Sequence, residues 1–532
     1  MLDWLFMRAM AATRTWDGGG GVDTNWNTAT NWSADTVPIV GDAVVFDTTS
    51  TNNATMNVAV PALLSLSVNT GYTGTITVTV DQSTDDAFGA CTFGVAFTFQ
   101  MNTTTAAECT TLTMSLGTVS ANAGTRVFNT SGNVSITGGT WNGGYLQAET
   151  AQNWSSSITL GDATGEGCSV AAAVTLTAAL TCSDLLIDGG GSVAKGTNAF
   201  TVNNNLTLGL VGTNFITSTS GAVIVTGQVA IQAAVDYIDF GSETWTVSGT
   251  GWTNATTSAS WDAGTGTVLF DSATGGTMTF AGANLAEAEF NSVTFTSSAG
   301  TAQTFTMATR GLRWLTTLTV SDASSTTALT SADLALGVAA DAADIVVGNG
   351  GILTANASTV LINGFTMTGG TSGTLTITTG AWTVSGGNWN SSGAGSIFTQ
   401  GTGSHIFGDA TITMLATDNT FDDFDSGAGT VTLATALIVT NVLLISSGTL
   451  VKTTFTITAS SLTMSGGDLT STSGDVSITG SVNISNSVSQ IDFGSETWTV
   501  SGTWTNSTTD AAWDAGTGTV IFDSATGGTM TF

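Results

Sequence analysis

A chain of 532 residues with 66 glycines, two prolines and 41% hydrophobic residues is long enough for several domains and too apolar for a disordered protein. Seven Lys and Arg residues stand against 38 Asp and Glu residues, giving a formal net charge of −31. Such a balance argues against a cationic groove for nucleic acid and against anionic membranes. No nucleic-acid partner is therefore expected. Membrane insertion is not expected either, because no apolar run approaches the roughly 20 residues of a membrane-spanning helix.

The first segment, residues 1–60, is predicted to be an N-terminal cap or attachment segment. It carries Trp16, Trp26 and Trp32 ahead of a strand pattern at Ala43–Phe46. A stack of repeats needs such an end unit because an open strand edge would pair with other chains. The opening residues, with an acidic group near the start and an arginine within the apolar run, do not fit a secretion signal, and none is expected.

The stretch "WDGGGGVD" offers Asp17 and Asp23 as oxygen ligands for calcium. Calcium-binding solenoids repeat a Gly-Gly-x-Gly-x-Asp nonapeptide in tandem, and this chain does not. We therefore interpret both aspartates as turn formers and expect no metal or other cofactor.

Residues 61–170 are predicted to be a first β-repeat region, and the four cysteines begin there. Cys91, Cys109, Cys168 and Cys182 form no CxxC pair, which makes metal binding improbable. Two disulfides would be expected if the chain matures outside a cell. At this low cysteine density, buried free thiols are the preferred expectation.

Strand signals dominate the chain and set the fold class. "GTITVTVD" (Gly74 to Asp81) and "TFTITASSLTMSGG" (Thr454 to Gly467) alternate Thr or Ser with apolar residues, the period of a strand with one buried face. The one Ala-rich helix candidate is Ser331 to Gly348. We predict an all-β fold, a repetitive β-solenoid of stacked rungs, with stacked antiparallel β-sandwich modules as the alternative.

A long duplication divides the rest of the chain. Residues 238–280 recur as residues 491–532 with one inserted glycine, Gly251, and four substitutions. We define repeat unit A as residues 171–300, a divergent β-repeat region as 301–430, and repeat unit B as 431–532. Unit B is expected to be incomplete at its C-terminal end, because after Phe280 unit A continues into another apolar strand pattern whereas unit B stops at Phe532. Stacked repeats explain why one stretch is written twice.

The duplication also carries the tryptophans and several aspartates. Trp245, Trp252 and Trp261 recur as Trp498, Trp504 and Trp513. Such rings can form platforms for sugars, but their recurrence within the repeat favours filling of the interior. Asp262, Asp271, Asp514 and Asp523 recur in the same way, which suits stacking turns better than a single catalytic cleft.

Candidate catalytic residues are few. His405, the only histidine, lies in "GTGSHIFGD" without a nucleophile motif nearby, so we interpret it as a loop or strand-edge residue. "TFDDFDSG" groups Asp422, Asp423 and Asp425, and a strand would place Asp423 and Asp425 on one face with Asp422 on the other. Paired acids can cleave glycosidic bonds, but solvated turn aspartates are the preferred interpretation. We predict no enzyme and no catalytic, cofactor-binding or metal-binding residue.

Thr-x-Thr triplets such as "TITVT" and "TLTIT" raise a further alternative, because register-matched rows of threonine can bind ice. The irregular repeat spacing argues against such rows, and high β-propensity explains the threonines.

The strings "NWSADTVPIVGDAVVFD" and "WDAGTGTVLFD", the latter followed by "FNSVTF", resemble the β-strand repeats of large phage virion fibres and of bacterial autotransporter-like surface proteins. The resemblance covers most of the chain and implies an elongated β-solenoid that serves attachment or particle decoration. It favours a structural phage virion protein: a fibre, spike or surface decoration. The alternatives are a bacterial cell-surface adhesin of the autotransporter type and a polysaccharide-cleaving tail spike.

The same resemblance sets the expected location and partners. We expect the protein at the virion surface or, alternatively, in an extracellular or cell-surface position. Expected partners are other copies of the chain, preferably in a trimer, other virion proteins, and a host glycan.

Overall fold

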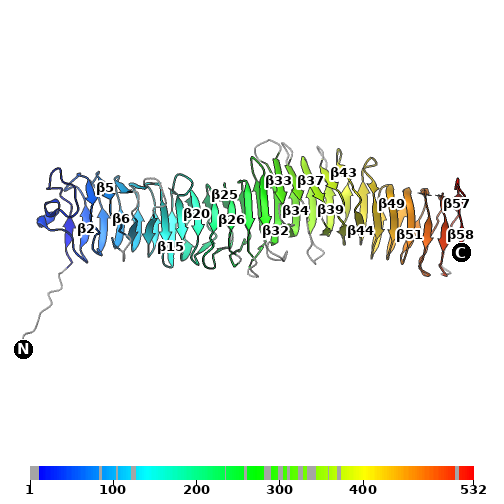
Figure 1. The fold of residues 1–532 in the computed structure, drawn as a ribbon, viewed down its shortest axis with the longest axis horizontal. Helices are drawn as coiled ribbons and strands as arrows, with labels where there is room; N and C mark the ends of the chain where they lie inside the picture. Colours follow the sequence, from blue (N-terminus) through cyan, green and yellow to red (C-terminus); the bar gives the residue numbers. More distant parts are fainter. Residues whose placement is uncertain are drawn as a thin grey trace, which may run out of the picture. The chain divides into compact units, whose positions relative to one another are not determined.

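A computed structural model describes residues 11–532 except 83–86, 103–105, 122–126, 234, 257–260, 281–288, 298–302, 308–311, 322–326, 332–342, 358, 368–372 and 510–513. The fold is an all-β parallel solenoid, as the strand periodicity predicts (Figure 1). The strand ladders of the described residues are parallel, so the alternative of antiparallel sandwich modules is wrong.

Helical structure in the described residues is limited to two 3-10 turns, η1 (Ala29–Asn31) and η2 (Ser33–Asp35). No helix there is long and apolar enough to span a membrane. Most of the helix candidate at 331–348 lies outside the described residues; of the described part, Ser331 ends strand β35 (Thr327–Ser331) and residues 344–347 form strand β36 (Asp344–Val347).

The chain divides into two compact units. Unit 1 comprises Met1–Gly249 with Thr253–Gly266, and unit 2 comprises Thr250–Trp252 with Thr267–Phe532. Strand β29 (Gly251–Asn254) lies where they divide. In each unit the chain runs through successive turns, and the strands of these turns belong to three sheets.

The strands of unit 1 are as follows. Its first sheet contains β1 (Thr13–Thr15), β2 (Ala43–Phe46), β4 (Ser65–Val68), β6 (Ala90–Phe93), β9 (Thr111–Met114), β12 (Val134–Ile136), β15 (Gln152–Ser156), β18 (Ala173–Leu176), β21 (Ser192–Gly196), β24 (Phe215–Ser218) and β27 (Tyr237–Ile238). Its second sheet contains β3 (Ala54–Met56), β5 (Thr75–Val78), β7 (Thr98–Met101), β10 (Thr118–Ala121), β13 (Thr140–Asn142), β16 (Thr159–Leu160), β19 (Leu180–Cys182), β22 (Phe200–Val202), β25 (Val223–Val225) and β28 (Thr244–Val247). Its third sheet contains β8 (Ala107–Cys109), β11 (Val127–Thr130), β14 (Tyr145–Ala148), β17 (Gly167–Val170), β20 (Asp184–Ile187), β23 (Leu206–Leu208) and β26 (Val229–Ile231).

Unit 2 repeats the scheme. Its first sheet contains β30 (Thr267–Asp271), β32 (Glu289–Thr296), β34 (Arg313–Val320), β36, β39 (Gly364–Met367), β42 (Trp389–Ser391), β45 (Ala410–Met414), β48 (Thr430–Leu433), β50 (Thr449–Thr453) and β52 (Asp468–Ser471). Its second sheet contains β31 (Gly276–Phe280), β33 (Gln303–Met307), β35 (Thr327–Ser331), β37 (Gly351–Asn356), β40 (Thr374–Ile377) and β43 (Ile397–Thr399). Its third sheet contains β38 (Val360–Ile362), β41 (Trp382–Val384), β44 (Ser404–Phe407), β46 (Thr420–Phe421), β47 (Asp423–Ser426), β49 (Leu437–Ile445), β51 (Ile457–Met464), β53 (Val476–Ile478), β54 (Val482–Ile484), β55 (Thr497–Val500), β56 (Trp504–Asn506), β57 (Thr519–Phe522) and β58 (Met530–Thr531).

Alternation of side chains builds the core. In β5, Ile76 and Val78 are fully buried while Thr75 and Thr77 face outward, and most strands repeat this pattern. Parallel rungs stack apolar side chains from successive turns on one another, because strand neighbours lie about 4.8 Å apart. Each rung therefore buries its inner face against its own other strands and against the rungs before and after it.

All four cysteines form disulfides, so the expectation of free thiols is wrong. Cys91 pairs with Cys109 and Cys168 pairs with Cys182, with a Cα–Cα distance of 5.9 Å in both pairs. All four side chains are buried. A solenoid turn folds back on itself, which brings residues 18 or 14 positions apart face to face across the interior. Residue spacing alone does not reveal that proximity.

The two copies of the duplication form corresponding strands. Trp245 in β28 and Trp498 in β55 are both fully buried, as equivalent positions should be. The environments of Phe270 and Phe522 differ, contrary to what strict equivalence predicts. Phe270 stacks on Phe295 with ring centroids 5.1 Å apart and is 2% exposed, whereas Phe522 is 41% exposed.

Candidate functional site

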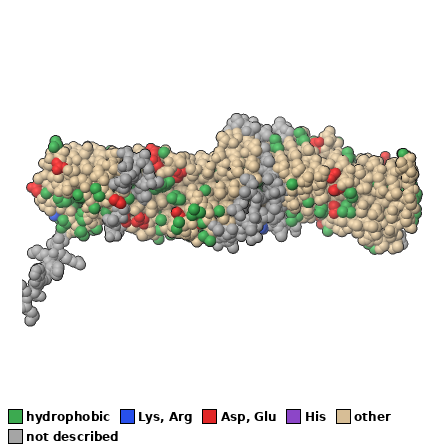
Figure 2. Space-filling model, in the orientation of Figure 1, with side chains coloured by type: hydrophobic (Ala, Val, Ile, Leu, Met, Phe, Trp, Pro, Cys, Tyr) green, Lys and Arg blue, Asp and Glu red, His purple; other side chains and the backbone are tan. Residues whose placement is uncertain are grey.

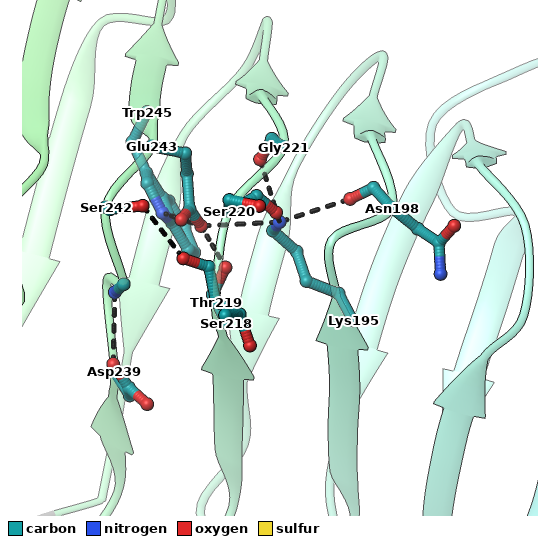
Figure 3. A network of polar contacts seen from close by, with 11 residues as sticks. Lys195, Asn198, Ser218, Thr219, Ser220, Gly221, Asp239, Ser242, Glu243 and Trp245 are labelled. Atoms are coloured by element: carbon teal, nitrogen blue, oxygen red, sulfur yellow. Dashed lines mark hydrogen bonds and ion pairs between the residues drawn. The ribbon is translucent and has the colours of Figure 1, made fainter.

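The most concentrated polar chemistry in unit 1 is buried around Lys195, on β21 (Figure 3). Its ammonium group donates hydrogen bonds to the carbonyl oxygens of Asn198 at 3.1 Å, Ser220 at 2.6 Å and Gly221 at 2.8 Å. These three acceptors match the three protons of a lysine ammonium. The side chain is 0% exposed, so the arrangement holds a full positive charge inside the protein.

Glu243 supplies the counter-charge. Its Oε1 lies 3.4 Å from Lys195 Nζ and accepts hydrogen bonds from the Trp245 indole, at 3.2 Å, and from the Ser218 hydroxyl. Lys195, Ser220 and Glu243 lie on three successive turns of the chain, as Figure 3 shows. The cluster therefore fastens one corner of the solenoid across three rungs.

Unit 2 contains the same centre in the second copy of the repeat. Lys452 donates to the carbonyl oxygens of Phe455, Ser473 and Gly474, and its Nζ lies 3.8 Å from Glu496 Oε1. The Trp498 indole donates to Glu496 Oε1 at 3.0 Å. Both charged side chains are 0% exposed.

Burial lowers the pKa of Lys195 and of Lys452, and in each case the attraction of the neighbouring glutamate opposes that shift. A neutral buried lysine can serve as a nucleophile, but here three carbonyls hold each ammonium away from solvent. The geometry therefore supports a structural ion pair rather than a reactive amine.

Sequence reasoning missed this centre, although a signal was present. Lys195 and Lys452 are the only two lysines of the chain, and both stand at the same place in the duplication, inside an apolar strand pattern. A rare charge repeated at a core position indicates a buried partner. The sequence does not identify the residue that pairs with Lys195, because Glu243 lies two turns further along the chain and only the fold brings the two together.

The duplicated aspartates form stacked turns, as predicted for Asp262 and Asp514. Asp262 Oδ1 accepts a hydrogen bond from the Gly264 backbone N–H at 2.9 Å, and Asp514 does the same with Gly516 at 2.9 Å. Each turn stacks on an identical Asp-x-Gly turn one rung earlier, through bridges from Asp239 and Asp492. Asp271 and Asp523 end or follow the next strands, β30 and β57, and remain at least partly exposed.

The acidic group at 422–425 is likewise spread between rungs. Asp423 Oδ1 accepts from the Val442 N–H at 3.0 Å, and Asp425 accepts from the Ser446 backbone and hydroxyl. Both lie on the outward face of β47, as predicted. Asp422 lies in the bend before β47, not on the opposite face of a strand, and accepts from the Thr440 hydroxyl. Partial burial raises the pKa of Asp425, while its bonds to Ser446 act the other way.

His405 is an interior residue and not the loop or strand-edge residue expected. It lies within β44 and is 0% exposed. Its ring centroid is 4.9 Å from that of Phe421 and 6.1 Å from that of Phe398. Burial lowers its pKa to about 4, so the imidazole is neutral at neutral pH. A buried neutral ring among aromatic side chains serves packing.

The five duplicated tryptophans that the structure describes fill the interior, which confirms the preferred interpretation for them and leaves no sugar platform at these five rings. Trp245, Trp252, Trp261, Trp498 and Trp504 are at most 8% exposed, and Trp513 lies outside the described residues.

Asp17 and Asp23 stabilise N-terminal turns. Asp17 Oδ1 accepts from the Gly19 N–H, and Asp23 accepts from the Asn25 N–H and the Thr28 hydroxyl, which lowers the pKa of Asp23. Within the described ranges, no group of three or more His, Cys, Asp or Glu side chains is arranged to hold a metal ion.

Threonines do form a register-matched row, which removes the spacing argument against one. Along the second sheet of unit 1, strand pairing aligns Thr75, Thr98, Thr118 and Thr140, and likewise Thr159, Thr181 and Thr201. The pair Trp141–Leu160 brings Thr140 level with Thr159 and so joins the two rows. The turn from Thr75 to Thr98 has 23 residues and that from Thr140 to Thr159 has 19. Corner loops absorb the difference in length, so irregular spacing in sequence is compatible with strict register.

No protein-family model, curated protein sequence or solved structure matches the chain.

Proposed function

We propose that this protein is a structural module of an extracellular surface assembly. Although its opening residues do not fit a secretion signal, its two disulfides favour export and display on a cell as an adhesin-type shaft. The observation that carries the proposal is the internal use of its rare charges. Both lysines form buried ion pairs that join successive rungs, and the two pairs occupy equivalent positions in the two copies of the repeat. Such residues stiffen a stack, since each centre constrains three turns at once.

The disulfides support export. All four cysteine side chains are at most 1% exposed, so oxidation has to occur while the chain folds. The cytosol keeps thiols reduced, whereas secretory compartments and the periplasm form disulfides. An extracellular protein therefore fits these two crosslinks directly.

A structural virion protein is the second candidate. The repeat strings that resemble phage fibres favour it, and a solenoid serves as a fibre, spike or decoration equally well. A virion protein assembles in a reducing cytoplasm, so its four cysteines should remain thiols until release.

One experiment separates the candidates. Antibody against the recombinant protein is applied to intact source cells and to purified particles from their lysate, and the recovered protein is treated with a thiol-alkylating reagent before and after reduction. We expect labelling of intact cells and four alkylated cysteines only after reduction. Labelling confined to particles, or thiols that react without reduction in freshly made protein, would overturn the adhesin-type proposal.

A further inference from the structure

Unit 1 carries an apolar patch at one corner, here called the aromatic patch, formed by the exposed side chains of Leu210, Val211 and Val235 and the half-buried rings of Phe215 and Tyr237. Leu210, Val211 and Val235 are 72%, 62% and 51% exposed. Phe215 on β24 and Tyr237 on β27 are register neighbours that face outward, and their rings stack with centroids 5.1 Å apart and planes 4° apart. Figure 2 shows hydrophobic side chains gathered on the visible face of this part of the chain.

A buried polar pair holds the patch in shape. Asn214 and Asp236 are both 0% exposed. The Asn214 side-chain amide donates to Asp236 Oδ1 at 3.2 Å and to the Gly209 and Val211 carbonyls, and its backbone N–H donates to Asp236 Oδ1 at 2.8 Å. The exposed apolar side chains are therefore presented by a rigid loop, which reduces the entropy lost when a ligand binds.

The second copy of the repeat lacks these devices. Asp468 and Gln490 occupy the positions of Phe215 and Tyr237, and Gly467 and Ser489 those of Asn214 and Asp236. The loop that carries Leu210 and Val211 is three residues shorter there. Only the exposed valine persists, as Val488. The stack folds without the patch, so the aromatic pair, its loop and its buried support are additions to the scaffold.

From these observations we infer that the aromatic patch binds a neutral glycan. The register neighbour of Phe215 on the side away from Tyr237 is Ser192, so the aromatic stack ends at Phe215 on that side. A sugar ring can lay its C–H face on an aromatic ring. Thr217 and Asp239, two residues further along on the same outward side, offer a hydroxyl and a carboxylate to sugar hydroxyls.

Charge selects the glycan class, and the size of the patch argues against a protein as its occupant. A chain with a net charge of −31 repels anionic polysaccharides. The patch has five side chains, whereas a specific protein interface uses roughly 20–30 residues on each side. The inference goes beyond the proposed function and does not depend on where the protein is displayed, because binding is a property of the isolated chain.

The test is affinity electrophoresis of the full chain in native gels that contain dextran, mannan, galactomannan or xyloglucan, with polygalacturonate as the anionic probe. We expect retardation by at least one neutral polymer and none by polygalacturonate. The double variant Phe215→Ala/Tyr237→Ala should weaken the apparent affinity roughly tenfold. Asp468→Ala/Gln490→Ala, at the equivalent positions of the other copy, should leave the retardation unchanged.

A gentler variant separates binding from folding. Phe215→Leu keeps an apolar side chain on β24 and removes only the ring, so its melting temperature should stay near that of the parent protein while retardation falls. Absence of retardation by all four neutral polymers would overturn the inference, as would equal loss in the Asp468→Ala/Gln490→Ala control. Concentration-dependent association of the parent chain that disappears in Phe215→Ala/Tyr237→Ala would assign the patch to self-contact instead.

Discussion

Gly264 lies directly over the backbone of Gly241, so that a Cβ atom on Gly264 would meet the Gly241 carbonyl oxygen at 2.0 Å. Both glycines have positive φ, at 58° and 62°, and close Asp-x-Gly turns on consecutive rungs. Two constraints therefore coincide at one position: a left-handed backbone and no space for a side chain.

Gly264→Ala should lower the melting temperature more than a left-handed backbone alone explains. The matched control is Gly190→Ala, since Gly190 has φ of 86° and nothing within 4 Å of the added Cβ. The control should cost about 1–2 kcal/mol, the penalty of a left-handed non-glycine residue. The rung contact should make Gly264→Ala clearly worse in parallel thermal melts; equal effects would show that the turns separate freely.

Lys195→Met should destabilise unit 1 by about 3–5 kcal/mol, because it leaves the Glu243 carboxylate buried without its counter-charge. Adding Glu243→Gln should recover part of this loss. Hydrogen exchange of the Ser218–Gly221 segment, read by mass spectrometry, checks both variants. Arg14→Met is the control, because Arg14 is partly exposed and the buried Asp42 carboxylate keeps its hydrogen bonds from the Ala12 and Ile39 backbone N–H groups, so the loss should be smaller. Exchange rates in Lys195→Met that match those of the parent would contradict the fastening role.

Acid should destabilise unit 2 through His405. Its pKa is about 4 in the folded protein and 6.5 in the unfolded chain, so the unfolded state binds the proton first. The full stability is present above pH 6.5 and is lost as pH falls towards 4, by about 3 kcal/mol. His405→Phe should flatten this part of the stability profile in denaturant titrations between pH 4 and 7. An unchanged profile would assign the acid sensitivity to carboxylates.

Reduction should loosen unit 1 and leave unit 2 unchanged, since both disulfides lie in unit 1. Each closes a loop of 18 or 14 residues and should contribute about 3 kcal/mol. Calorimetry with and without reductant measures the stability that each disulfide contributes. The two double variants to compare are Cys91→Ala/Cys109→Ala and Cys168→Ala/Cys182→Ala. A reductant effect that persists when all four cysteines are replaced would have another source.

The local sequence pattern predicts the strands and many interior positions of this protein. It does not predict which residues far apart in the sequence pair with one another. Alternation in stretches such as Thr75 to Val78 identifies strands, and recurrence of Trp245 as Trp498 identifies interior positions, because both signals lie in neighbouring residues or in exact repeats. The Cys91–Cys109 bond and the Asn214–Asp236 pair join residues about one turn apart. Turn length varies, so such proximity becomes visible only when the coil is built.

One aligned row of threonines includes turns of 23 and of 19 residues. Corners of this solenoid accept added or deleted residues while the ladder keeps its alignment, and the loop between β23 and β24 differs from its shorter counterpart after β51 in this way. Foreign peptides inserted at that corner should be displayed at a fixed rung of the solenoid. Insertions at the corners of different rungs should therefore hold epitopes at defined distances from one another.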